Sequence, residues 1–421
     1  MGILGVLLLS VSIHTDFEAG SLGKVERLSE THFRCAVKGE SDQDQRNRQA
    51  NWYYFRVNGA AGREITIDLV DLVGEYDYRP GSHAVTEGTR PFYSYDRQTW
   101  TAFGEVEWDA KDISLRLRFT PSSNRVWIAH VPPYTTRDLA RLLDGFRRHP
   151  HLKKEVVGKT VHGRDMLLLT VSNPAVPDAN KKVVWLMARQ HAWETGASWV
   201  SEGALRFLLS SDPRAARIRD EVIFKIFPMA DPDGVARGGV RFNAYGYDLN
   251  RNWDAVDPQK MPEIAAQRKA VLDWVDSGQR VDLFLSLHNT EKADYLEGPF
   301  FGVDSEFRRL AERFYRLLME TTTFNPTRPL RDSGPTTTAG KPGRMTVYQG
   351  LFHDRKIPAL LMEQMVEYNS KLGRVPTIED RTQFGAALVR ALWAATVPLK
   401  SQLSAARKDS ACGSLSVSPT N

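Results

Sequence analysis

The chain has 421 residues, of which 42% are hydrophobic, 25% charged and 10% aromatic, and its net charge at pH 7 is +5. This length exceeds what one compact core usually holds, so we expect two domains plus tails. Lysine and arginine are interspersed with acidic residues, so no nucleic-acid partner is expected. The two cysteines, Cys35 and Cys412, lie near opposite ends of the chain. This distribution argues against a disulfide framework and against a cysteine-based metal site.

Residues 1–13 (MGILGVLLLSVSI) are apolar but too short to span a membrane, and we expect no stable membrane association. They contain the apolar core of a signal peptide, yet no basic residue precedes it and no clean cleavage site follows. The alternative is that residues 11–16 already form a first β-strand. We favour a cytoplasmic location, since a secreted or periplasmic one requires that residues 1–13 belong to a signal peptide.

Residues 12–133 have the pattern of an antiparallel β-sandwich domain. Short segments rich in aromatic and β-branched residues are separated by glycine and proline turns. In residues 113–120 (ISLRLRFT) every second residue is apolar, as a half-buried strand requires. The expected strands are residues 51–58, 64–72, 91–103, 113–120 and 125–131.

Residues 134–397 predict an α/β domain with a mixed, mostly parallel central sheet flanked by helices. Four nearly continuous apolar runs are typical of strands buried on both faces: residues 182–188, 221–227, 281–287 and 358–362. Helical spacing of apolar residues appears in residues 136–146, 196–209, 262–276, 305–320 and 378–395. Residues 398–421 show no apolar period and are expected to be a disordered tail.

Polar residues follow three of these four strands, where ligands gather in open α/β sheets. His191 and Glu194 follow the first strand, His288 the third and Glu363 the fourth. Two imidazoles and one carboxylate are a standard catalytic zinc set that leaves a position open for water. A His-x-x-Glu motif alone is more often a solvated surface pair. The placement of all four residues at predicted strand ends favours a metal site.

The long loop of residues 231–253 follows the second strand and contains Arg241, Asn250 and Arg251. The Arg251 guanidinium could hold a carboxylate through two hydrogen bonds, which suits a free C-terminus. The alternative is that Asp248–Arg251 (DLNR) is a turn that only stabilises its own loop.

These residues resemble the zinc carboxypeptidase family, and more closely its cytosolic carboxypeptidase-like branch, which carries a β-sandwich before the catalytic domain. The specific motifs are RQHAWE at 189–194, DPDGV at 231–235, Arg241 before DLNR, Leu287-His288, and Glu363 after an apolar strand. The resemblance implies one zinc ion per chain, bound by His191, Glu194 and His288. It also implies Glu363 as general base, Arg241 as stabiliser of the oxyanion, and Asn250 and Arg251 as the clamp on the substrate's terminal carboxylate.

The chain departs from the family pattern at several positions. The usual Pro-Gly between the first histidine and the glutamate is Ala192-Trp193, and the usual Asn before Pro-Asp-Gly is Asp231. Tyr348 is the candidate for the tyrosine that precedes the base on a mobile loop in the classical branch.

Substrate preference depends on the segment before the Glu363 strand. Lys341 or Arg344 could line the side-chain pocket and favour acidic C-terminal residues; alternatively, both are solvated loop charges.

The resulting expectation is a metallocarboxypeptidase acting on the C-terminal tails of peptides or proteins. Two alternatives remain. One is a zinc amidohydrolase or deacylase for small acylated amino acids, and the other is a non-catalytic protein that binds peptide tails.

Overall fold

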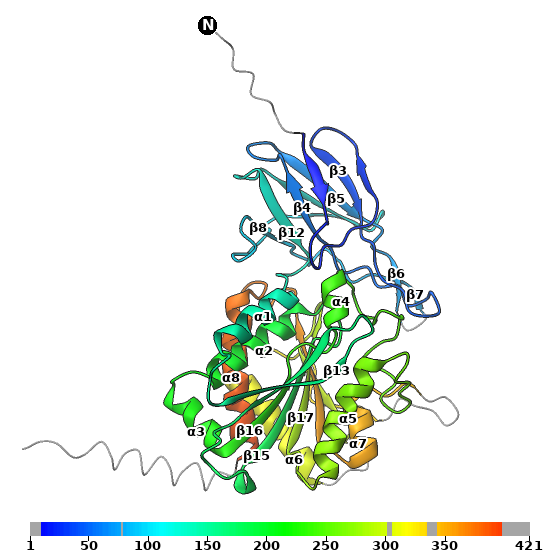
Figure 1. Ribbon diagram of the computed structural model, residues 1–421. Coiled ribbons are helices and arrows are strands. Elements are labelled where there is room, and N and C mark those ends of the chain that lie inside the picture. The colour runs from blue at the N-terminus through cyan, green and yellow to red at the C-terminus, as the bar shows by residue number, and fades with distance from the viewer. Residues whose placement is uncertain (1–9, 77–78, 301–304, 335–342, 398–421) are drawn as a thin grey trace, which may run out of the picture.

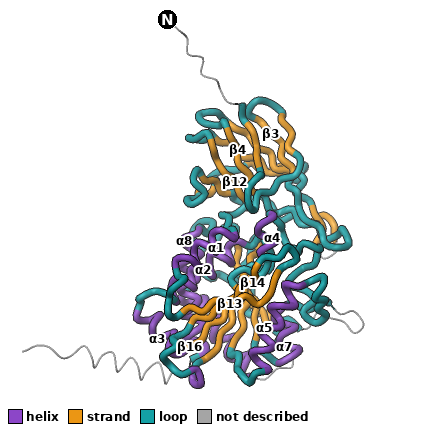
Figure 2. Tube along the Cα trace, in the orientation of Figure 1, coloured by secondary structure: helices purple, strands orange, loops and turns teal. Residues whose placement is uncertain are grey.

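The computed structural model describes residues 10–76, 79–300, 305–334 and 343–397. The chain forms a β-sandwich that sits on one end of a larger α/β domain (Figure 1). Figure 2 shows the separation of the all-strand part from the part where strands and helices mix. The residues 1–9 of the signal-peptide alternative and the tail 398–421 lie outside the described residues.

The sandwich consists of two five-stranded sheets. One has the order β1 (Ser12–His14), β4 (Tyr54–Asn58), β12 (Arg125–Ala129), β8 (Phe92–Ser94) and β9 (Thr101–Ala102). The other has the order β10 (Glu107–Asp109), β11 (Ser114–Phe119), β5 (Ile65–Val70), β3 (His32–Ala36) and β2 (Val25–Arg27). Neighbouring strands are antiparallel except β3 and β5, which run parallel. A separate hairpin of β6 (Gly74–Tyr76) and β7 (Arg79–Ser82) extends from the sandwich.

The α/β domain is built on an eight-stranded mixed sheet. Its order is β13 (Leu152–Lys159), β14 (Asp165–Val171), β16 (Val222–Phe227), β15 (Lys182–Ala188), β17 (Leu283–Thr290), β20 (Ala359–Met365), β18 (Tyr295–Gly298) and β19 (Arg331–Asp332). The four central strands β16, β15, β17 and β20 are parallel. Their side chains alternate between two cores, as Val184 and Leu186 join one hydrophobic cluster and Val183 and Trp185 the other. Burial on both faces explains the nearly continuous apolar sequence of these strands.

Helices cover both faces of this sheet (Figure 1). One face packs against α1 (Thr136–Gly145), α2 (Thr195–Leu208), α3 (Pro213–Glu221), α6 (Ser305–Thr321) and α8 (Ile378–Thr396). The other packs against α5 (Pro262–Asp276) and α7 (Val347–Arg355). The short helix α4 (Pro232–Arg237) and a 3₁₀ turn at Asp178–Asn180 complete the elements. None of the described helices combines the length and apolar character needed to cross a membrane.

The expected fold class is confirmed, including the antiparallel character of the first domain and the mostly parallel centre of the second sheet. The strand expected within residues 11–16 is present as β1. The sequence pattern did not predict β13, β14, β18 and β19, which flank the central strands, or the helices α3, α4 and α7. In the sandwich it did not predict β2, β3, β6, β7 and β10, and residues 91–103, expected as one strand, form the two short strands β8 and β9. β13 is an edge strand in which four of the eight residues are charged and none is fully buried, so it lacks the apolar pattern by which the central strands were found.

An aromatic cluster joins the two domains. Trp52, Tyr54 and Trp127 of the sandwich belong to the same hydrophobic cluster as Trp193 and Val240 of the α/β domain. The connection between β12 and α1 is short, and Thr135 caps α1 through a capping box with Asp138. The sandwich is therefore packed directly on the end of the α/β domain where the sheet's polar residues gather.

Candidate metal centre and active site

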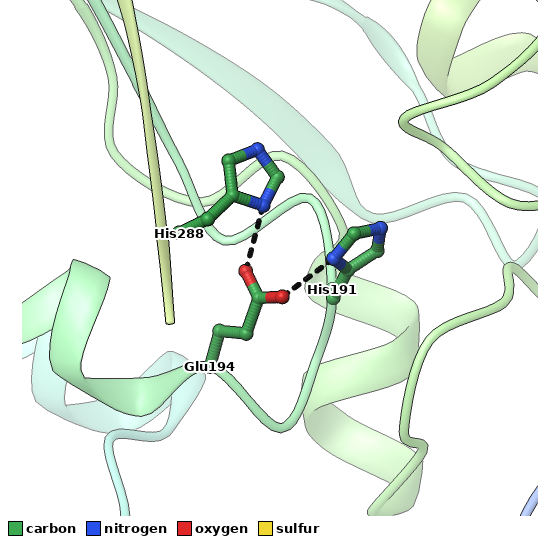
Figure 3. A group of neighbouring side chains, drawn as sticks. All are labelled: His191, Glu194 and His288. Atoms are coloured by element: carbon green, nitrogen blue, oxygen red, sulfur yellow. Dashed lines mark hydrogen bonds and ion pairs between the residues drawn. The ribbon is translucent and has the colours of Figure 1, made fainter. Parts of the chain in front are cut away.

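Two histidines and a glutamate meet at the carboxyl ends of β15 and β17 (Figure 3). β15 ends at Ala188, and the chain turns at Arg189, whose φ is +66°, before reaching His191 and Glu194. Glu194 occupies the N-cap position of α2, while His288 belongs to β17 itself. Because β15 and β17 are parallel neighbours, their carboxyl ends lie at the same edge of the sheet.

The carboxylate of Glu194 lies between the two imidazoles, as Figure 3 shows. Its Oε1 is 2.6 Å from Nδ1 of His191, and its Oε2 is 2.9 Å from Nδ1 of His288. The second pair lacks hydrogen-bond geometry, so Oε2 of Glu194 and Nδ1 of His288 have no hydrogen-bond partner among the described residues. Each of the three residues is at most 2% exposed. Buried polar atoms without partners, in a set of two nitrogens and a carboxylate, fit a bound divalent cation.

The electrostatics of the cluster favour the deprotonated forms of Glu194 and His288, which are the forms that can bind a metal. Burial alone would raise the pKa of Glu194, but His191 and His288 outweigh it and lower this pKa to about 2. Burial lowers the pKa of His288 below its ordinary value. Burial and Arg241 oppose protonation of His191, but the carboxylates of Glu194 and Asp248 raise its pKa. A metal ion would compete with that proton for the ring nitrogen.

The second nitrogen of each imidazole is held by a polar side chain. Nε2 of His191 is 3.1 Å from Oδ1 of Asp248. Nε2 of His288 is 2.8 Å from Oγ of Ser286 and 3.1 Å from Oε1 of Gln190. Since Ser286 donates its own proton to Gln190, its oxygen can accept from His288. These partners hold the proton on Nε2 of both rings and turn both Nδ1 atoms towards Glu194.

Glu363 lies next to His288 on the adjacent strand. The two residues are register partners of the parallel strands β17 and β20, so their side chains leave the same face of the sheet. Burial, followed by the carboxylates of Glu194 and Glu297, raises the pKa of Glu363 well above its ordinary value, although Arg241 opposes this. Its Oε2 is buried without a hydrogen-bond partner in the described part of the chain. This environment suits a residue that accepts a proton during a reaction.

Arg241 links the histidine cluster to the surrounding cavities. Its Nε donates to Oδ2 of Asp248 at 2.7 Å, and Asp248 in turn contacts His191. Its guanidinium lies over the ring of Tyr76, 5.6 Å from the centroid. The first cavity is lined by Glu194, Glu363 and Arg241 together with residues of the sandwich, including Tyr76. Glu363, Glu194 and Arg241 therefore face the same space.

A second cavity adjoins the first and shares Gln49, Tyr76 and Arg241 with it. Arg251 and Arg344 both line this second cavity. Nη1 of Arg251 donates to the backbone oxygen of Asn250 at 2.8 Å, and the positive charge of Arg251 helps to lower the pKa of Asp248. The second cavity is therefore lined by three arginines, together with the carboxylates of Asp42 and Asp248, and Asp248 contacts His191 of the candidate metal cluster.

Two expected substrate residues have internal contacts instead. The side-chain oxygen of Asn250 accepts the N–H of Val347, the first residue of α7, at 2.9 Å. The hydroxyl of Tyr348 is buried, 2.8 Å from Oε1 of Glu297 and 2.8 Å from Oγ of Ser333. Neither residue lines the two cavities. Lys341 lies outside the described residues.

The structure also brings in polar residues that were not expected at the site. Asp248, Gln190 and Ser286 hold the two imidazoles, and Tyr295, the register partner of Glu363 on β18, lines the first cavity. Gln190 and Ser286 lie one and two residues before predicted ligands, which was an available signal. Tyr295 could not be assigned to the site from the sequence, because its strand, β18, was not predicted.

Two family models match consecutive parts of the chain. The model of the cytosolic carboxypeptidase N-terminal domain matches residues 13–131, and that of zinc carboxypeptidase matches residues 139–296. The chain belongs to the zinc carboxypeptidase family, in its cytosolic carboxypeptidase-like branch. Among solved structures, a metallo-carboxypeptidase from Burkholderia cenocepacia is similar with a TM-score of 0.78 and 27% identity, over 91% of this chain and 98% of that one.

Relatives of the family differ in length from this chain. Human cytosolic carboxypeptidase 6 is 26% identical over 307 residues, covering 70% of this chain and 60% of the relative. Human cytosolic carboxypeptidase 2 is 28% identical over 330 residues, covering 72% and 35%. An uncharacterized protein from Zymomonas mobilis is 29% identical over 284 residues, covering 67% and 68%. The match thus covers about three fifths of the length of human cytosolic carboxypeptidase 6 and about a third of that of human cytosolic carboxypeptidase 2.

Both departures from the zinc carboxypeptidase motifs have a structural place. Trp193 lines the first cavity, donates its backbone N–H to Val240 at 3.0 Å and packs against His130, so it forms a wall between the site and the sandwich. Asp231 caps α4, with Oδ1 accepting the N–H of Gly234 at 2.8 Å.

Proposed function

We propose that this chain is a zinc-dependent carboxypeptidase that hydrolyses the C-terminal peptide bond of peptides or proteins. The main support is the register of β17 and β20, which sets Glu363 beside His288 and next to the His191–Glu194 pair. Metal-assisted hydrolysis requires metal ligands, here two imidazoles and a carboxylate, and a proton acceptor next to them.

His191, Glu194 and His288 would hold one zinc ion per chain, through the two Nδ1 atoms and the carboxylate. A bound zinc ion supplies Lewis acidity, which lowers the pKa of water and polarises the scissile carbonyl. Asp248, Ser286 and Gln190 keep the two rings oriented for this task.

Glu363 accepts the proton of the attacking water and returns it to the leaving amine. Arg241 stabilises the negative charge that develops on the carbonyl oxygen. Its ion pair with Asp248 holds the guanidinium in position before the reaction starts.

Arg251 makes the enzyme an exopeptidase in this proposal. The substrate's terminal carboxylate would pair with its guanidinium, while an internal peptide would leave this cation without a partner. Asn250 supports the clamp by accepting from Nη1 of Arg251 with its backbone oxygen. Tyr348 could join the substrate only by giving up its contacts with Glu297 and Ser333.

Arg344 lines the same cavity as Arg251 and would favour acidic C-terminal residues. Acidic tails of peptides or proteins are therefore the proposed substrates. Because several named relatives are cytosolic carboxypeptidases, a cytoplasmic location is part of the proposal.

The test is a peptide panel with free C-terminal Glu, Leu or Lys, and the same peptides with amidated ends. We expect release of the last residue from the free peptides only, and loss of this release with a zinc chelator. Glu363→Gln should lower kcat by about 10²- to 10⁴-fold. The control Glu379→Gln, on the outer surface of α8, should keep the wild-type kcat.

Chelator-insensitive release, or full activity of Glu363→Gln, would contradict the proposal. Cleavage of small acylated amino acids in place of peptides would support an amidohydrolase. Saturable binding of tail peptides without any release would indicate a non-catalytic binding protein.

A further inference from the structure

A loop of the sandwich, residues 40–49, is held rigid by its own hydrogen bonds. Glu40 and Gln49 form an isolated antiparallel bridge, with both backbone hydrogen bonds at 2.9 Å. Between them, Asp42 accepts the backbone N–H groups of Asp44 and Arg46 and the side-chain amide of Asn47. We call this segment the 40–49 loop. These hydrogen bonds lie within the sandwich, so the loop has internal support in addition to its contacts with the catalytic domain.

The side chain of Glu40 leaves this loop and enters the catalytic domain. Its Oε2 accepts three consecutive backbone N–H groups, from Val240 at 2.9 Å, Arg241 at 2.6 Å and Phe242 at 2.8 Å. Its Oε1 pairs with Nη2 of Arg237 at 2.5 Å. Successive N–H groups that point at one spot form a concave anion-binding site. Here the anion is a carboxylate supplied by the other domain.

A second contact fixes the same segment. The N–H of Gln43 donates to the backbone oxygen of Gly246 at 3.1 Å. Gly246 has a φ of +84°, and a Cβ there would come within 2.6 Å of the nitrogen of Gln43. The 40–49 loop therefore lies directly on the loop between α4 and α5, which carries Arg241.

Arg241 is thus held by the sandwich at both ends. Its backbone N–H is bound by Glu40, and its guanidinium lies over the ring of Tyr76 from β6. Within the catalytic domain, Asp248 holds its Nε. Without Glu40, three N–H groups next to the reaction site would lose their charged acceptor, which leaves the backbone free to relax.

We propose that Glu40 is a positioning residue for Arg241. The sandwich would then contribute to catalysis by holding the backbone of Arg241 in place. The inference rests on the proposed function, in which Arg241 stabilises charge in the transition state. A small displacement of such a group reduces the rate more than it reduces substrate binding.

Glu18 provides a matched control. It is also a sandwich carboxylate that reaches the catalytic domain, where Oε1 accepts the N–H of Thr136 at 2.9 Å and Oε2 pairs with Arg137. These residues begin α1 and do not line either cavity. Glu18→Gln therefore weakens the domain contact without touching the Arg241 segment.

We expect Glu40→Gln to lower kcat by about ten- to a hundredfold with a change in KM of less than about threefold. Glu40→Asp, which keeps the charge, should recover part of this loss, and Glu18→Gln should retain the wild-type kcat. In an Arg241→Ala background, Glu40→Gln should lower kcat by less than about twofold, since its effect passes through Arg241. Equal losses in Glu18→Gln and Glu40→Gln, or additive losses with Arg241→Ala, would overturn the inference.

Amide hydrogen exchange separates this inference from the proposed function. The amides of Val240, Arg241 and Phe242 should exchange faster in Glu40→Gln and at the wild-type rate in Glu18→Gln. Unchanged exchange in Glu40→Gln would refute the positioning role even in an active enzyme. If the wild type released no C-terminal residue, the proposed function would fail, and the exchange rates alone would decide whether Glu40 holds this segment.

Discussion

Asp231 predicts an unusual pH dependence of folding stability. Its side chain is fully buried, and only Oδ1 has a hydrogen-bond partner among the described residues, the N–H of Gly234. Burial raises the pKa of Asp231 to about 7, although Arg237 and the Gly234 N–H oppose this. The carboxyl group is therefore partly protonated near neutral pH, in a family where Asn is usual at this position.

The sign of the effect follows from proton linkage. In the unfolded chain Asp231 loses its proton near pH 4, whereas in the folded chain it keeps the proton up to about pH 7. The folded state binds more protons in this window, so the free energy of unfolding falls as the pH rises through it. A rise of the pKa from 3.8 to about 7 corresponds to at most about 4 kcal/mol, since each pH unit is worth about 1.4 kcal/mol.

Asp231→Asn removes the ionisation and keeps the oxygen that caps α4. We expect the variant to resemble the wild type near pH 4 and to exceed its unfolding free energy by up to about 4 kcal/mol above about pH 7. Equilibrium urea unfolding across this range, followed by circular dichroism, measures the difference.

Asp212→Asn at the cap of α3 is the control. There Arg214 lowers the pKa of Asp212 to about 2, so this group stays ionised throughout the window and its loss should shift the curve by a constant amount. If the unfolding free energies of Asp231→Asn and the wild type differed by the same amount at every pH, the reasoning would be refuted.

Two further predictions concern the site. Treatment with a chelator should lower the melting temperature of the wild type by several degrees, and added zinc should restore it. Zinc should not raise the melting temperature of His288→Ala. A rise in this variant would contradict the proposed ligand set. Arg344→Glu should reduce the kcat/KM ratio of C-terminal Glu over C-terminal Lys peptides by about 10- to 100-fold, with Arg344→Gln in between; an unchanged ratio would remove Arg344 from the pocket.

The central elements of the catalytic domain were readable from local pattern alone. The apolar run of β15 needed no alternation, because successive residues enter two different cores on opposite faces of the sheet. The helices α5 and α8 were found from the spacing of apolar residues that face one of these cores. The edge strand β13 was not predicted, because a strand with four charged residues out of eight and none fully buried has no comparable apolar run.

The candidate ligands were also visible as residue types at strand ends, together with their resemblance to a known family. The distances between these residues could not be predicted from the sequence. Glu363 stands beside His288 because β20 pairs with β17 in one particular register, and a shift by one residue would have turned it to the other face. Likewise, no local pattern showed that Tyr348 would be buried against Glu297.

The amino-acid sequence alone was enough to locate the central strands and the longer helices of the catalytic domain, and to name residues that could bind a metal or move a proton, because these properties depend on residue type and on neighbours along the chain. Only the tertiary structure decided that Asp248, Ser286 and Gln190 orient the ligands, and that Glu40, some 200 residues before Arg241, reaches its backbone. Contacts of this kind depend on how strands are ordered and how two domains dock, and neither is encoded in the spacing of residues within one element.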